Sequence, residues 1–68
     1  MNLFMKLEGR RFASDLVLSA RSLLHTHAGT QELIGNLQLA CTGRPASYAA
    51  GITEIIDLIR SQEDRPCA

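Results

Sequence analysis

The sequence lacks an excess of either charge, because seven Lys and Arg residues balance seven Asp and Glu residues. A chain without net charge has no long-range field that would attract nucleic acid or an anionic membrane. It also lacks any apolar run near the roughly 18 residues that a membrane span requires. Residues 1–8 hold too short an apolar stretch for a secretory signal peptide, so we expect a cytoplasmic protein without a membrane partner.

Cysteine and proline are scarce as well, with two residues of each in the chain of 68. Two cysteines are too few for the disulfide framework of a small secreted protein, although a single Cys41–Cys67 bridge remains an alternative. With 46% hydrophobic residues and so little proline, the chain is expected to fold rather than stay disordered. Small domains without disulfides or metals commonly gain stability from oligomerisation.

What the sequence does contain is three segments with helical periodicity, separated by turn-forming residues at 27–30 and 42–45. Each segment repeats apolar residues at the three- and four-residue spacing of one helix face. We therefore predict an all-α fold, a small three-helix bundle built from a helix hairpin plus a third helix. Residues 1–62 form the expected domain, and residues 63–68 form a polar C-terminal tail. The apolar faces are wide for so short a chain, which predicts that dimerisation completes the bundle.

The limits of the first two helices follow from their capping residues. The first helix is expected to start near Asn2, an accepted N-cap residue, rather than after Gly9. The second is predicted over 31–42, with Thr30 as its N-cap and Gly43 in the left-handed position that ends many helices. The predicted apolar face of the first helix is Phe12, Ala13, Leu16, Val17, Ala20, Leu23 and Leu24, and that of the second is Leu33, Ile34, Leu37, Ala40 and Cys41.

The third helix is predicted to start at Pro45, because a proline at the first helical position loses no needed hydrogen bond. Ser47 is a competing N-cap one turn later. The small residues at 49–51 would let a second backbone approach closely at the start of this helix. Its predicted apolar face is Tyr48, Ala49, Ile52, Ile55, Ile56 and Ile59.

Three leucines, Leu18, Leu39 and Leu58, fall outside the apolar faces of their helices. At about 100° per residue, Leu18 and Leu39 lie opposite those faces, whereas Leu58 lies on a flank. Single exposed leucines are ordinary on protein surfaces, but a contiguous apolar patch indicates an interface. Three such residues in one small domain predict a surface that binds a protein partner.

No group of residues predicts catalysis or metal binding. His25 and His27 are the only histidines, and side chains two residues apart on a helix do not face each other. A zinc site would need further ligands, for which Cys41 is the only candidate. A thiol on a buried helix face is inert as a nucleophile. We therefore expect a non-enzymatic protein with no metal and no cofactor.

Three short helices are also the framework of a helix-turn-helix domain, so a dimeric DNA-binding transcriptional regulator is the alternative. Arg10, Arg11, Arg44 and Tyr48 are the residues that would contact nucleic acid. The early turns of the third helix, residues 46–51, carry no Arg, Lys, Asn or Gln that would contact base edges. The stronger expectation is a homodimeric interaction module, such as an adaptor, small chaperone, inhibitor or regulator. A structural subunit of a larger assembly is a third alternative.

Overall fold

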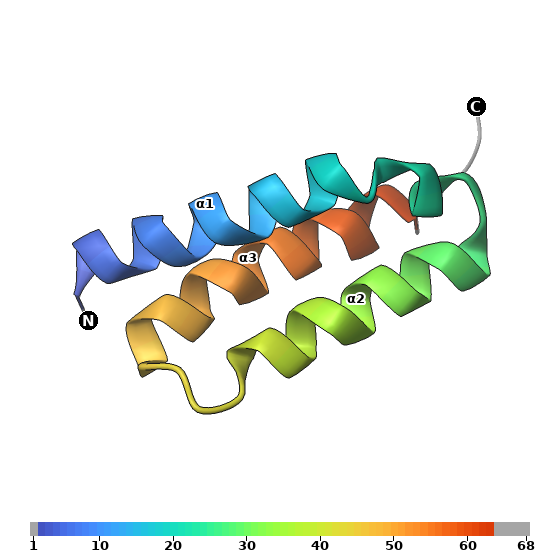
Figure 1. The fold of residues 1–68 in the computed structure, drawn as a ribbon. Coiled ribbons are helices and arrows are strands. Elements are labelled where there is room, and N and C mark those ends of the chain that lie inside the picture. The colour runs from blue at the N-terminus through green and yellow to red at the C-terminus, as the bar shows by residue number, and fades with distance from the viewer. Residues whose placement is uncertain (1, 64–68) are drawn as a thin grey trace.

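The computed structural model describes residues 2–63, which form three α-helices and one short 3-10 helix (Figure 1). The predicted all-helical bundle is therefore confirmed. In chain order the elements are α1 (Leu3–Ser19), the 3-10 helix η1 (Arg21–His25), α2 (His27–Cys41) and α3 (Ala46–Glu63).

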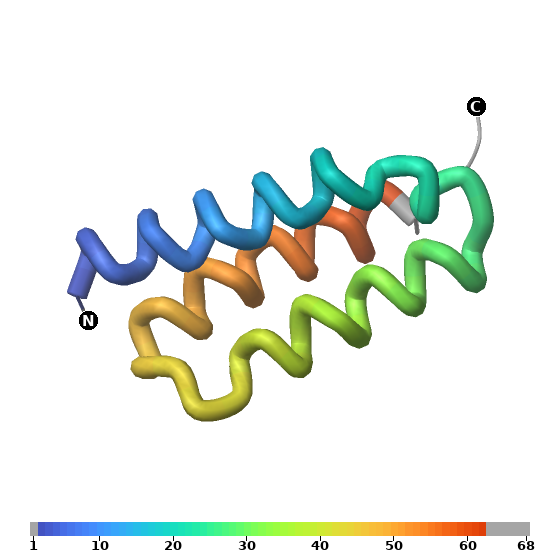
Figure 2. Tube along the Cα trace, in the orientation of Figure 1, coloured from blue at the N-terminus to red at the C-terminus, as the bar shows by residue number. Residues whose placement is uncertain are grey.

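The third helix organises the bundle, because α3 packs against both α1 and α2. α1 and α3 run in the same direction, and α2 runs opposite to both (Figure 2). The fully buried apolar side chains come from all three helices: Ala13, Leu33, Ile34, Leu37, Ile52 and Ile56. The core is therefore small, and half-buried side chains such as Phe12, Leu16 and Tyr48 surround it.

Two glycines bring α1 and α3 into backbone contact. A Cβ atom on Gly9 would overlap the Tyr48 carbonyl of α3, and one on Gly51 would overlap the Lys6 carbonyl of α1. The close approach predicted for residues 49–51 is thus confirmed. At the same end of the bundle, the backbone N–H of Asn2 donates to the Ser47 hydroxyl at 2.8 Å.

The first helix begins where the sequence predicts and ends earlier. The Asn2 side-chain oxygen accepts a hydrogen bond from the Met5 N–H at 3.2 Å and caps α1. The prediction that one helix continues through Leu24 is wrong, because the chain leaves the helix at Ala20 (φ −115°, ψ 22°). The Ala20 N–H bonds to two carbonyls of the preceding turn, and the tighter η1 follows. This change of helix type turns the chain toward α2.

The second helix begins four residues earlier than predicted. Thr26, not Thr30, is its N-cap, and the Thr26 hydroxyl accepts from the Gly29 N–H at 2.9 Å. Thr30 is buried inside the helix, where its hydroxyl donates to the Thr26 carbonyl at 2.9 Å. Gly29 lies within the first turn because its missing side chain leaves room for the Leu23 carbonyl. The prediction for Gly43 is confirmed, since its φ is 77°.

The third helix starts at Ala46, one residue after the predicted Pro45. The Pro45 carbonyl accepts from the Ala49 N–H at 3.0 Å, so the proline precedes the first helical residue. Ser47 lies inside the helix, where its hydroxyl accepts from the N–H of Asn2, the N-cap residue of α1, instead of capping α3.

Candidate interaction surface

The three leucines singled out by the sequence are all exposed: 66% for Leu18, 73% for Leu39 and 56% for Leu58. They do not share one surface. Leu18 lies near the C-terminal end of α1 and Leu39 near that of α2, and these two helices run in opposite directions (Figure 1). Leu58 borders a depression of about 390 Å³ beside Arg10, Glu54 and Asp57.

Exposed apolar side chains concentrate instead on α1. Leu3 is 67% exposed, Phe4 70% and Leu7 50%, and Leu18 belongs to the same helix. At about 100° per residue these four side chains fall within an arc of about 100°, on the side of α1 away from the buried Gly9 and Ala13. We call these four residues the outer face of α1.

Leu3, Phe4 and Leu7 were not among the predicted residues, because the apolar face predicted for the first helix begins only at Phe12. A signal for them was present. Leu3 and Leu7 point about 40° apart, and Leu7 and Leu18 about 20° apart, once the helix is extended back to Asn2. The Asn2 N-cap bond agrees with the helix start that the sequence predicts, so this signal could have been used.

Charged residues flank the outer face of α1 asymmetrically. At helical spacing Lys6 and Arg10 lie on one flank, and Glu8 and Asp15 lie on the other. The basic flank is adjacent to α3, where Glu54 accepts from the Lys6 ammonium at 2.8 Å and from the Arg10 Nε at 3.2 Å. The hydrogen bond from Lys6, together with the positive charges of Lys6 and Arg10, lowers the pKa of Glu54.

The residues predicted to contact nucleic acid are engaged mostly within the chain. The Arg44 guanidinium lies 5.1 Å from the Tyr48 ring centre and 5.8 Å from that of Phe12, a cation–π arrangement. Arg10 pairs with Glu54, while Arg11 is exposed on α1. α2 and α3 lie side by side in opposite directions (Figure 1), whereas the helices of a helix-turn-helix cross steeply.

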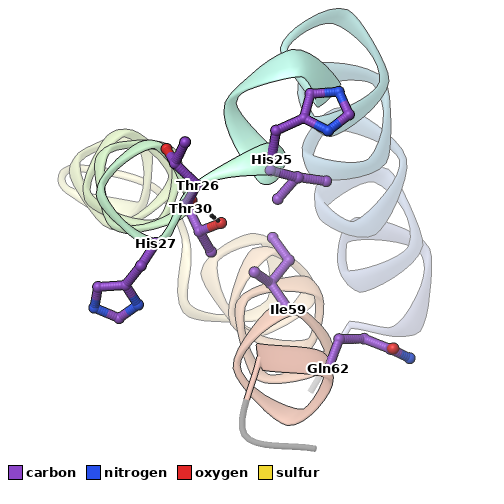
Figure 3. A pocket seen from close by; sticks show the side chains of 7 residues that line it. His25, Thr26, His27, Thr30, Ile59 and Gln62 are labelled. Atoms are coloured by element: carbon purple, nitrogen blue, oxygen red, sulfur yellow. Dashed lines mark hydrogen bonds between the residues drawn. The ribbon is translucent and has the colours of Figure 1, made fainter. Parts of the chain in front are cut away.

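The two histidines lie beside a depression of about 670 Å³ between the start of α2 and the end of α3 (Figure 3). Their imidazoles point in different directions, as predicted. His25 ends η1, whereas His27 begins α2, so the two histidines belong to different helices. Within residues 2–63, no three His, Cys, Asp or Glu side chains are grouped to hold a metal ion.

Cys41 is half-buried, and its thiol lies 3.8 Å from the Ala49 carbonyl oxygen. It packs beside the core, in line with the prediction for its helix face. Cys67 lies outside the described residues, and so does the alternative of a Cys41–Cys67 bridge. No helix in the described part of the chain combines the length and apolar character needed to cross a bilayer.

No protein-family model, curated protein or solved structure matches this chain. Its function must therefore be inferred from its own surface.

Proposed function

We propose that this chain is a small non-enzymatic interaction module that binds another protein through the outer face of α1. The observation that carries the proposal is that Leu3, Phe4, Leu7 and Leu18 share one arc of a helix whose other side packs against α3. A helix that is apolar on opposite sides is typical of one that is covered on both sides. A bound partner would supply the second covering layer.

Homodimerisation belongs to the same proposal. Among the residues that the structure describes, the buried core contains only six apolar side chains, and domains of this size commonly gain stability by association. Covering the four exposed side chains would contribute stability in proportion to the apolar area removed from water. The four lie opposite the core, so a partner could cover them without disturbing the bundle.

The DNA-binding alternative has less support in the described residues. Arg10 and Arg44 bind Glu54 and two aromatic rings within the chain, and the first turns of α3 are half-buried. A gel-shift experiment at about 50 mM salt, where phosphate contacts are strong, tests this alternative. A shift that weakens steeply with added salt would support it.

The proposal is tested with two double variants that carry the same change in charge. Leu7→Glu with Leu18→Glu places two carboxylates on the outer face of α1. Leu39→Glu with Leu58→Glu places them on exposed positions elsewhere. Each purified chain is immobilised and used to capture proteins from cells of the native host, after circular dichroism has shown that it is folded.

We expect the wild type and the Leu39/Leu58 variant to retain the same proteins and the Leu7/Leu18 variant to lose them. Equal retention by both variants would contradict the proposal. Loss only with the Leu39/Leu58 variant would move the binding surface to α2 or α3.

A further inference from the structure

The outer surface of α1 follows the spacing of a coiled coil. Five of its residues are separated alternately by three and four positions, as are the a and d positions of a heptad. Position a is occupied by Phe4, Arg11 and Leu18, and position d by Leu7 and Ser14. Three of the five are large exposed apolar residues. The helix is already held in place by α3, so pairing through this surface would not require a new helix to form.

The charges beside this surface distinguish the two directions in which a second copy could pair. In heptad terms Arg10 occupies position g, and Glu8 and Asp15 occupy position e. In a parallel pair, position g faces position e of the other helix five residues further on, so Arg10 would face Asp15 of the second copy. In an antiparallel pair, the acidic flanks carrying Glu8 and Asp15 would face each other. Only the parallel arrangement is complementary in charge.

We infer that the outer face of α1 binds the same face of a second copy, and that the two α1 helices pair in parallel about a twofold axis. This inference rests on the proposed function of that face. The guanidinium of Arg10 has five N–H donors, so its contact with Glu54 through Nε leaves donors for Asp15 of the second copy. Twofold symmetry gives two equivalent pairs, each formed by Arg10 of one chain and Asp15 of the other.

The dimer is expected to be weak. The face from Leu3 to Leu18 is about 22 Å long, and the polar residues Arg11 and Ser14 lie at its centre. A polar residue at position a lowers the stability of a coiled coil. Interfaces of below roughly 1,200 Å² are typical of transient contacts, so we expect a dissociation constant of order micromolar.

The test is sedimentation equilibrium of the full chain at low salt, with Asp15→Arg as the variant and Glu32→Arg as its control. Both substitutions change the net charge equally, and Glu32 is an exposed residue of α2. In a parallel dimer, Asp15→Arg places two positive groups opposite each other and weakens association by about tenfold. In an antiparallel dimer, the new guanidinium would meet Glu8 of the second copy, and association would become tighter.

A nitroxide attached through Ser19→Cys, with both native cysteines replaced by serine, gives an independent measure of direction. Ser19 is exposed at the end of α1. Parallel pairing brings the two labels close together, whereas antiparallel pairing offsets them along the helices by about 20 Å.

Weaker association with Asp15→Arg, an unchanged control and closely spaced labels would support the inference. Tighter association, or an equal effect of Glu32→Arg, would overturn it. A wild type that stays monomeric at several hundred micromolar would also overturn it. In that case the proposed function still stands if Leu7→Glu with Leu18→Glu abolishes capture of another protein, and it fails if that capture is unaffected.

Discussion

Gly51 of α3 lies directly against the carbonyl oxygen of Lys6 on α1, with no space between them for a side chain. Gly9 stands in the same relation to the Tyr48 carbonyl, so each helix contributes one glycine to the contact. This backbone contact joins α1 closely to α3, so one side of α1 is buried in the bundle. The opposite side of α1, with its four large apolar residues, is left exposed.

Gly51→Ala is expected to destabilise the fold by about 1–3 kcal/mol, the usual cost of overpacking. The added Cβ atom would lie 2.7 Å from the backbone nitrogen of Arg10 and 3.0 Å from the carbonyl carbon of Lys6, so the helices would have to separate. The higher helix propensity of alanine offsets at most about 1 kcal/mol. Urea unfolding followed by circular dichroism measures the change, and an unaltered or higher midpoint would contradict the prediction.

Gly35→Ala is expected to have the opposite effect. Gly35 lies inside α2, and a Cβ atom there would meet nothing within 4 Å apart from its chain neighbours and the backbone of its own helix. Alanine should therefore stabilise the chain by about 0.5–1 kcal/mol, because glycine loses more backbone entropy on folding. The same urea titration applies, and any fall in the midpoint would show that this position is constrained in a way the structure does not display.

Thr26→Ala is expected to lower stability by about 1 kcal/mol, because the Gly29 N–H at the start of α2 loses its acceptor. Thr26→Ser, which keeps the hydroxyl oxygen, should retain most of the stability. Thermal unfolding of the two variants beside the wild type measures this difference. If both variants unfold at the same temperature, loss of the N-cap hydrogen bond does not explain the change in stability of Thr26→Ala.

The lowered pKa of Glu54 predicts that stability falls in acid. Because the folded-state pKa lies below the unfolded value, the contribution is present at neutral pH and above. It is lost as the pH falls from about 5 toward and through the folded pKa. Glu54→Gln should remove this part of the pH dependence, since an amide does not ionise in this pH range. Urea midpoints measured from neutral pH to about pH 3 test it, and identical profiles for both chains would refute it.

Much of the helical framework was predictable because its determinants are local. The Asn2 cap and the left-handed Gly43 each act through their own backbone or their near neighbours. The end of α1 and the start of α2 were not predictable in the same way. Thr26 and Thr30 are both good N-cap residues, and burial of Thr30 decided between them.

The candidate surface was likewise predictable only in part. Helical spacing alone placed Leu18 and Leu39 outside the apolar faces of their helices, and both side chains are exposed. Spacing within one helix does not indicate how the helices are arranged. The separation of Leu18 from Leu39 was therefore evident only from the opposite directions of α1 and α2 in the fold. The three amphipathic helices follow from the sequence alone, because periodicity is a local property. The tertiary structure decided which side of α1 stays open, because the contact at Gly9 and Gly51 joins residues that are far apart in the chain.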